Sequence, residues 1–351
     1  MSVSTTAGGR AASLKSFLPL IGAVAIWGGN WPVMKFGLSH VSPLWFAALR
    51  FGSAAVISFV VLAAMRRVRL PSRQEWPLVM SVGLLQMAAF TALALWALQY
   101  VPPGRASVVA YATAIWVIPL SSLVLGERPS RWQWLATGFS YAGIAMIVAP
   151  ALGGWEVHAV LGLTMLLGAS LAWSVSIIHL RAHRHVRLGA DMIPWECAVA
   201  TVPLAALAVL RDGAPDLAAM ADIWPAIAYT GPLATALTFI VVLNVTQALP
   251  PAATSIAMLG VPVLGLVLSA VAWHERISAD LSAGLALIAL GVVTTALAAA
   301  GSAGTAWTPG GTLNRAARAR IRARYQGSTD GSRFSVRNTK VEWVCRRPGS
   351  L

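Results

Sequence analysis

The sequence predicts an all-α integral membrane protein with ten transmembrane helices, arranged as two inverted-topology repeats of five helices each. Three observations lead to this fold class. The chain has 351 residues, of which 57% are hydrophobic and only 11% charged, less than half the charged share of an ordinary soluble domain. Charged residues are absent from long stretches of the sequence. The first part of the chain also matches the second part at a fixed spacing.

Stretches without Asp, Glu, Lys or Arg locate the helices, because a helix needs about 20 mostly apolar residues to cross the hydrocarbon. Seven stretches of this kind occur, and one of them, 223–274, is long enough for two helices and is divided at Pro250-Pro251. Two further apolar segments, 43–65 and 190–210, carry charge but have helix length. The predicted spans are 17–38, 43–65, 77–99, 104–125, 131–150, 159–180, 190–210, 224–247, 252–273 and 279–300.

A shift of 148 residues aligns 76–147 with 224–295 without a gap. Each repeat contains five helices, an odd number, so the second repeat crosses the membrane in the opposite sense to the first. We expect repeats at 17–150 and 159–300, between an N-terminal segment at 1–16 and a tail at 301–351. The most telling pairs are Trp76/Trp224, Pro77/Pro225, Gln99/Gln247, Ser107/Ser255, Glu127-Arg128/Glu275-Arg276 and Gly143/Gly291.

Two sets of matched residues predict structural roles: the glutamates at the turns between helices and the small residues in the last helix of each repeat. Glu127 and Glu275 lie at turns between helices, where each carboxylate can accept hydrogen bonds from the free N–H groups of the next helix. In the last helix of each repeat, small residues recur on one face, so we expect close helix packing there. These small residues are Ala136, Gly143, Gly284 and Gly291.

The distribution of Lys and Arg predicts the orientation, because short cytoplasmic loops are enriched in both. With the N-terminus inside, the inner loops hold nine arginines and the outer connections at most four Lys or Arg. We therefore expect a multi-pass protein of the cell (inner) membrane with both termini in the cytoplasm. The tail carries +8 of the net charge of +14 and reads as a disordered cytoplasmic extension. With few aromatic residues beside its arginines, it does not predict nucleic-acid binding.

Three segments resemble one known family. The segment "AIWGGNWPVMKFGLSHVSPLWFAALRF" at 25–51 is similar to the start of an EamA-type domain of the drug/metabolite transporter superfamily. The segments "LGERPSRWQWLATGFSYAGIAMIV" and "WHERISADLSAGLALIALGVV" resemble the end of that domain, once in each repeat. The resemblance covers residues 17–300. It implies ten helices, a ligand bound in a central cavity, and export or exchange of a small metabolite.

Charged residues inside predicted spans are candidate binding groups, because an Arg or Asp at a helix centre costs about 2.5 to 3.5 kcal/mol on insertion scales. Arg50 and Glu196 occupy equivalent positions on the second helix of each repeat. Arg50 is a candidate partner for a carboxylate or another anion, and Glu196 for a cation or a proton. The alternative is that Arg50 bonds helix-end carbonyls and Glu196 contacts a neighbouring helix.

Aromatic and amide side chains within the spans complete the candidate substrate site. The rings suit an aromatic, amphipathic or cationic solute, although each could instead serve helix packing. We also expect the first span to kink or unwind over 28–32, because Pro32 lacks the N–H that would bond the Gly28 carbonyl. The further candidate substrate-binding residues are Trp27, Asn30, Trp96, Tyr111, Trp173 and Asn244.

These features favour a secondary transporter for a small metabolite, an amino acid or a related amphipathic solute, that works by alternating access. Proton coupling through Glu196 is part of this hypothesis. The alternatives are a membrane-embedded enzyme or a non-transporting membrane scaffold, but the sequence contains no recognisable catalytic set and no phosphate-binding loop. No cofactor is expected. His179, His183 and His185 do not predict a metal site, because no carboxylate or thiolate accompanies them at ligand spacing.

Overall fold

The protein is described from a computed structural model, which covers residues 7–154, 157–248, 251–304, 336–337 and 340–341. The chain divides into two units, Met1–Ala298 and Ala299–Leu351. The first contains the helical bundle, and the second contains a short antiparallel pair of strands. Most of the predicted tail at 301–351, like residues 1–6, lies outside the described residues.

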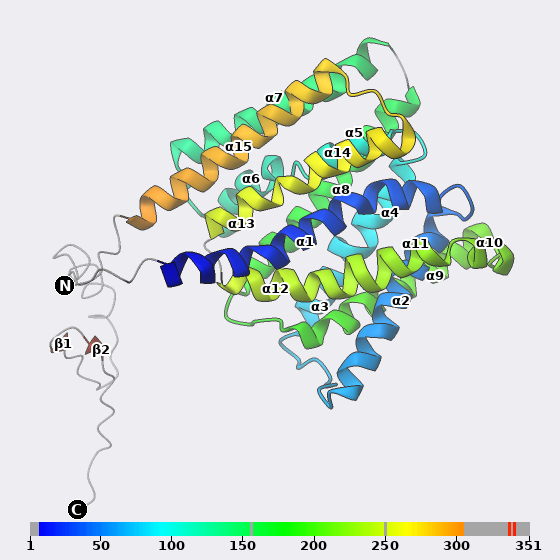
Figure 1. The fold of residues 1–351 in the computed structure, drawn as a ribbon, viewed down its shortest axis with the longest axis horizontal. Coiled ribbons are helices and arrows are strands. Elements are labelled where there is room, and N and C mark those ends of the chain that lie inside the picture. Colours follow the sequence, from blue (N-terminus) through cyan, green and yellow to red (C-terminus); the bar gives the residue numbers. More distant parts are fainter. Residues whose placement is uncertain (1–6, 155–156, 249–250, 305–335, 338–339, 342–351) are drawn as a thin grey trace, which may run out of the picture. The chain divides into compact units, whose positions relative to one another are not determined.

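The elements follow one another along the chain as helices joined by short connections (Figure 1). Helices η1 and η3 have π geometry and η2 is a 3-10 turn. The described elements are α1 (Ala7–Gly37), α2 (Pro43–Ala64), α3 (Trp76–Ser81), η1 (Val82–Ala89), α4 (Phe90–Ala97), α5 (Pro103–Ala110), α6 (Ala114–Leu125), α7 (Arg131–Gly153), α8 (Val157–Ala182), η2 (Ala190–Met192), α9 (Ile193–Asp212), α10 (Leu217–Asp222), α11 (Trp224–Ala228), η3 (Tyr229–Leu237), α12 (Thr238–Ala248), α13 (Pro251–Met258), α14 (Gly260–Trp273), α15 (Ala279–Gly304), β1 (Val336–Arg337) and β2 (Lys340–Val341).

The predicted membrane fold is confirmed. Within the described part of the chain, nine helical stretches are long and apolar enough to cross a membrane. Helix α1 is not among the nine, but it occupies the first predicted span. The described residues therefore supply a helix for each of the ten predicted spans, in the predicted order.

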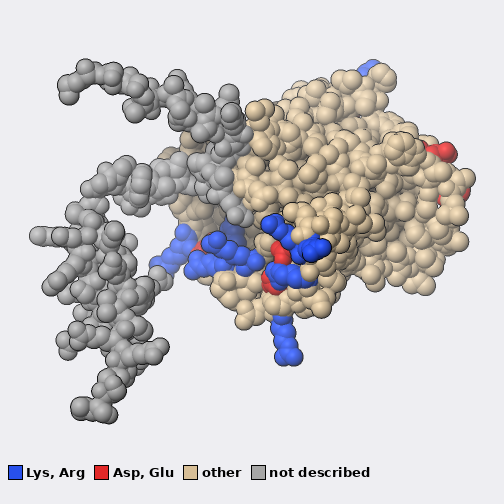
Figure 2. Space-filling model, turned by 60° about the horizontal axis from the view of Figure 1, so that its bottom comes forward, with Lys and Arg blue, Asp and Glu red and all other residues tan. Residues whose placement is uncertain are grey.

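The two faces of the bundle differ in charge. Successive crossings bring the connections 65–75, 126–130 and 183–189 to one end of the bundle, which we name the basic face, together with the end of α12 and the start of α13. Lys and Arg gather at this end in Figure 2. The opposite face contains the end of α4, the start of α5 and the turn between α14 and α15.

The first span does not unwind. Helix α1 runs without interruption through Pro32, so the expected unwinding over 28–32 is wrong. The two glycines serve close packing instead: a Cβ at Gly28 would lie 2.6 Å from Leu264 Cβ, and one at Gly29 would lie 2.6 Å from the Tyr229 hydroxyl. The same hydroxyl donates a 2.8 Å hydrogen bond to the Ile26 carbonyl. Neighbouring helices thus support the helix around its proline, as is usual within membranes.

The π segments η1 and η3 occupy equivalent positions in the two repeats, and each of them contacts a helix of the other repeat. Gly83 of η1 lies against α9, where a Cβ would be 2.7 Å from the Glu196 carbonyl oxygen. Gly231 of η3 lies against α2, where a Cβ would be 2.5 Å from the Arg50 carbonyl oxygen. The third helix of each repeat therefore packs against the second helix of the other, as two inverted repeats require. π segments are rare and often mark functional sites.

The last helices of the two repeats, α7 and α15, run side by side (Figure 1). A Cβ at Gly143 would lie 2.6 Å from the Gly284 carbonyl oxygen, and one at Gly291 would lie 2.6 Å from the Ala136 carbonyl oxygen. The predicted close packing of these small residues is therefore confirmed. Backbones approach this closely only where side chains are small.

Candidate functional site

A small cavity of about 40 Å³ lies at the centre of the bundle, among helices of both repeats. Its wall contains cationic, amide, thioether and aromatic side chains. It is lined by Trp27, Asn30, Trp31, Met34, Arg50, Phe51, Gln86, Met87, Phe90, Thr91, Ala94, Tyr111, Trp173 and Phe239.

Arg50 supplies the positive charge of this cavity. The residue is only 8% exposed, and Nε donates to Thr235 Oγ1 at 3.1 Å while Nη1 points to the Met34 sulfur at 3.2 Å. No ion pair of the described residues includes Arg50. Thioether sulfur is a weak acceptor, and a buried charge is normally paired. Arg50 can therefore bind an anionic group of a ligand.

Asn30 adds a second polar group one helical turn before Met34. Its amide nitrogen points to the Met34 sulfur at 3.5 Å, and its Oδ1 atom is buried without a hydrogen-bond partner among the described residues. A buried acceptor without a donor is unfavourable. Asn30 can therefore accept a hydrogen bond from an ammonium or N–H group placed in the cavity.

Aromatic rings form most of the remaining wall and are held in place. Trp27 Nε1 donates to the Ala234 carbonyl at 2.8 Å, and its ring meets Phe239 edge to face at 5.5 Å. Across the cavity, Phe90 and Trp173 pack edge to face at 4.7 Å. Such pairs favour a fixed geometry, so the wall offers a rigid apolar surface beside Arg50.

Two larger cavities lead from this centre toward the basic face. One, of about 390 Å³, shares Trp27, Phe90 and Trp173 with the small cavity and extends to Leu243 of α12 and Met258 of α13. The other, of about 480 Å³, follows α13. Tyr111 lines all three cavities. The combined space suits a small metabolite, which the central cavity alone could not hold.

The opposite face is closed by contacts between α5 and the second repeat. The Glu275 carboxylate accepts hydrogen bonds from the backbone N–H groups of Gly104 at 2.8 Å and Arg105 at 3.1 Å. Burial raises the pKa of this carboxyl group. Arg105 pairs with Asp280 at 3.2 Å. The hydroxyl of the fully buried Ser107 donates to the Gly104 carbonyl of its own helix at 2.7 Å and lies 3.3 Å from the Pro262 carbonyl of the second repeat. Glu275 therefore caps a helix, but it is α5 rather than the expected next helix, α15.

The repeat partners of these residues are in a different environment at the basic face. Ser255, the partner of Ser107, is exposed and lines the 480 Å³ cavity. Ile256, the next residue of α13, is 41% exposed. The side chain of Glu127, the partner of Glu275, is 51% exposed and lies 4.0 Å from Arg181. The bundle is thus closed at one face and open at the basic face.

The structure gathers five of the eight candidate substrate residues in the central cavity: Trp27, Asn30, Arg50, Tyr111 and Trp173. The other three are outside its lining. The Trp96 ring lies under the Arg211 guanidinium at 5.0 Å, Asn244 is exposed, and Glu196 is buried in the first turn of α9.

Sequence reasoning missed several lining residues. Met34 could have been found, because Trp27, Asn30, Trp31 and Met34 recur at the spacing of one helix face. Thr235, which does not line the cavity but accepts a hydrogen bond from Arg50, could not have been found. Its repeat equivalent is Met87, and nothing in a single sequence indicates that a hydroxyl there meets Arg50.

In the described part of the chain, helices at the ten predicted spans form two inverted repeats around a polar central cavity that is open at one face, and these features define a multi-pass membrane transporter of small solutes. The chain belongs to the EamA-like transporter family, which matches residues 14–149 and 160–297.

Relatives and a solved structure agree with this family. The chain is 25% identical over 281 residues to the "Uncharacterized transporter YoaV" of Bacillus subtilis (strain 168), covering 80% of this chain and 96% of the relative. It is 27% identical over 194 residues to the "Probable amino-acid metabolite efflux pump" of Escherichia coli (strain K12), covering 54% and 62%. A solved structure described as "Crystal structure of protein" has the same fold, with a TM-score of 0.59 at 21% identity over 81% of this chain and 97% of that one.

Proposed function

We propose that this chain exports or exchanges a small amphipathic metabolite that carries a carboxylate, an amino acid or a related compound, by alternating access. The observation that carries the proposal is the buried Arg50 guanidinium, which has no carboxylate partner among the described residues and faces an aromatic cavity. The names of two relatives, each a probable amino-acid metabolite efflux pump, support the same substrate class.

The polar groups of the cavity match the two ends of an amino acid. A carboxylate can form a bidentate pair with a guanidinium, and it would replace the weak Met34 sulfur contact of Arg50. The unpartnered Oδ1 atom of Asn30 can accept from the ammonium group. Trp27, Trp173 and Tyr111 would then surround the side chain of the solute.

Alternating access is supported by the different environments of equivalent residues in the two repeats. Equivalent residues are engaged at the opposite face, where Glu275 and Ser107 hold α5 in place, and exposed at the basic face, where Glu127 and Ser255 lie. Because the repeats share one design, exchanging their conformations would close the basic face and open the other one. A transporter needs two such states of similar energy.

The charge of the open face supports the proposed orientation and is compatible with export. Short basic loops remain in the cytoplasm, so we place the basic face there, with both termini, and the protein in the inner membrane. The cavity would then load from the cytoplasm, as an exporter requires. We assign proton coupling to Glu196, which is 6% exposed on α9 and is a carboxyl group whose protonation could bias the two states.

Transport by purified protein in liposomes tests this function. Labelled amino acids are offered with and without an imposed proton gradient, and the solute is recovered and shown to be chemically unchanged, which separates a transporter from an enzyme. Arg50→Gln should weaken apparent affinity about 10- to 100-fold, as expected for one lost charged hydrogen bond of about 1.5 to 3 kcal/mol.

The control is Arg211→Gln, which removes an exposed arginine that stacks on Trp96 outside the cavity and should leave affinity unchanged. Glu196→Gln should abolish the response to the gradient. If Arg50→Gln and Arg211→Gln transported carboxylates equally well, Arg50 would not be the substrate site.

A further inference from the structure

The basic face carries more positive charge than its own carboxylates can neutralise. Segments 65–75, 126–131 and 181–191 hold nine arginines and three acidic residues, a net charge of +6. Figure 2 shows this gathering of cationic side chains. The question is which of these arginines serve the fold and which are left to meet a ligand.

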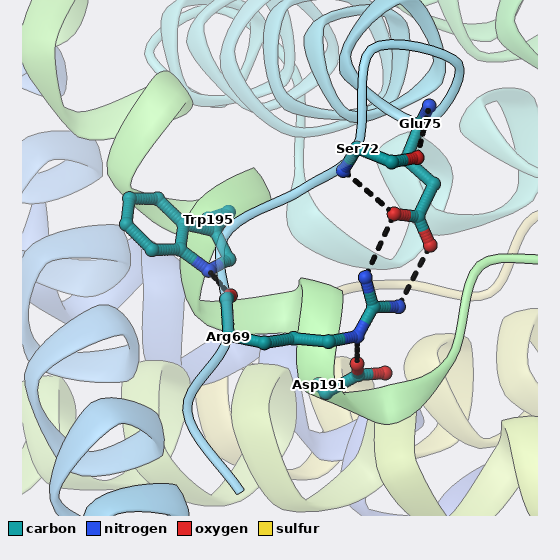
Figure 3. Close-up of polar contacts among 5 residues, drawn as sticks. All are labelled: Arg69, Ser72, Glu75, Asp191 and Trp195. Carbon is teal, nitrogen blue, oxygen red and sulfur yellow. Dashed lines mark hydrogen bonds and ion pairs between the residues drawn. The ribbon is translucent and has the colours of Figure 1, made fainter.

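Arg69 serves the fold. Its guanidinium forms two hydrogen bonds with the Glu75 carboxylate, at 2.7 and 2.8 Å, and a further ion pair with Asp191 (Figure 3). The Ser72 backbone N–H donates to Glu75 at 2.8 Å, and Trp195 Nε1 donates to the Arg69 carbonyl at 2.9 Å. These contacts fix the connection between α2 and α3 against the start of α9. They pair Arg69 with two carboxylates, so this cluster by itself has a net charge of −1.

Arg66 and Arg67, in the same connection, are exposed, and no ion pair of the described residues includes either of them. Both line a groove of about 470 Å³ between the end of α2 and η2, beside Leu62 and Val68. Arg69 and Asp191 also line this groove. Counting Glu75, which pairs with Arg69, three arginines and two carboxylates leave a net charge of +1. The groove can therefore hold an anion between two guanidinium groups.

The backbone of Arg66 is an independent sign of a role for its side chain. It has φ of 53° at the end of α2, where its N–H bonds the Ala63 carbonyl and the next N–H bonds the Leu62 carbonyl. A left-handed residue in this helix-ending motif is usually glycine, because a Cβ is unfavourable there. Helix α9, the repeat equivalent of α2, ends at a glycine, Gly213, with φ of 78°, as α6 does at Gly126, whereas α14 ends at His274 with φ of 52°. An arginine kept in a strained position points to a function.

The surroundings of the groove place it at the level of lipid headgroups. The exposed apolar side chains of Val60, Val61 and Met65 lead along α2 to Arg66. Trp76 and Trp195 meet edge to face at 6.1 Å on the neighbouring helices, and indole rings concentrate at membrane interfaces. A ligand in this groove can thus contact cationic and apolar surface at the same time.

We propose that the groove formed by Arg66, Arg67 and Val68 binds the phosphodiester headgroup of an anionic phospholipid, with an acyl chain lying along α2. Basic pockets between transmembrane helices are suited to such headgroups. The tail of this chain does not fit as the occupant, because residues 301–351 carry a net charge of +8 and would be repelled.

Lipid binding by the purified full chain in detergent tests the proposal. The thermal midpoint is followed during titration with phosphatidylglycerol, phosphatidylcholine or inorganic phosphate. We expect phosphatidylglycerol to raise the midpoint at a concentration at least tenfold lower than phosphatidylcholine requires, and phosphate alone to have no effect. An equal response to phosphatidylcholine, or a full response to phosphate, would overturn the proposal.

Two variants and a control locate the site. Arg66→Gly should weaken phosphatidylglycerol binding at least tenfold and, because glycine suits the left-handed backbone, should not lower the midpoint measured without lipid. Arg67→Gln should weaken binding to a similar extent. Arg184→Gln removes the same charge from an exposed position of the basic face outside the groove and should change binding less than twofold. A loss with Arg184→Gln equal to that with Arg66→Gly would mean diffuse attraction rather than a site.

Discussion

The contact between Glu275 and the start of α5 should set the balance between the two states of the transporter. The carboxylate accepts two backbone hydrogen bonds, from Gly104 and Arg105. Glu275→Gln keeps one acceptor oxygen and removes the other together with the charge. Hydrogen bonds to charged groups contribute about 1.5 to 3 kcal/mol. Because this carboxylate is only half-buried, we expect the lower end, about 1.5 kcal/mol, which is roughly a tenfold change in population.

Cysteine labelling measures this shift. Ser107 is fully buried now and should become accessible when the opposite face opens, as Ser255 is at present. In a background with Cys197 and Cys345 replaced by alanine, Ser255→Cys should react quickly with a maleimide and Ser107→Cys slowly. Adding Glu275→Gln should raise the labelling rate of Ser107→Cys about tenfold.

The mirror-image control is Glu127→Gln. Its carboxylate is exposed in the present state and would be engaged only in the other one, so this variant should lower the labelling rate of Ser107→Cys. In the protein with both Glu127 and Glu275 intact, Ser107→Cys should label more slowly than Ser255→Cys. Equal labelling rates would refute the assignment of the closed face. A rise with Glu127→Gln would refute the exchange of roles between the repeats.

Two further predictions concern stability. Gly143→Ala should lower the thermal midpoint in detergent by the equivalent of about 1 to 3 kcal/mol, because its Cβ would lie 2.6 Å from the Gly284 carbonyl oxygen. The control is Gly138→Ala on the same helix, whose Cβ would meet nothing within 4 Å and which should leave the midpoint unchanged. Equal losses in the two variants would contradict the packing argument. The Arg69 guanidinium lowers the pKa of Glu75 from 4.5 to about 2, so its stabilisation is complete above pH 4.5 and is lost as the pH falls toward 2. The protection factor of the Ser72 amide, which compares its exchange rate with the intrinsic rate at the same pH, should fall over this range and lose this pH dependence in Glu75→Gln. An unchanged pH profile of the protection factor in that variant would disprove the role of the carboxylate.

The candidate site could be predicted only in part, because the sequence does not show in which direction each side chain points from its helix. A sequence position gives the depth of a residue in the membrane, but not the side of the helix that faces the cavity. Arg50 and Glu196 are equivalent in the repeat, yet Arg50 lines the central cavity and Glu196 does not. Asn244 has the polarity of a binding residue and is exposed instead. Each outcome depends on the rotation of a helix against its neighbours.

Local backbone geometry was also decided by neighbours. Pro32 predicts a break in α1 by its chemistry, but contacts of α14 and Tyr229 with the glycine pair keep the helix continuous. The departures from α geometry occur at η1 and η3. Gly83 and Gly231 lie there at equivalent positions of the two repeats, but π geometry was not predicted from the sequence.

By itself the sequence determined the membrane class, the order of the helices and the inverted repeat, because these depend on hydropathy, charge and internal similarity along the chain. Tertiary structure alone decided which face is open, since Glu127 and Glu275 are the same residue in the same local context and differ only in what packs against them. It also decided that Arg69 is paired with Glu75 and Asp191 while Arg66 and Arg67 are not. Both the open face and the pairing of these arginines depend on distances between separate helices, which no local sequence pattern records.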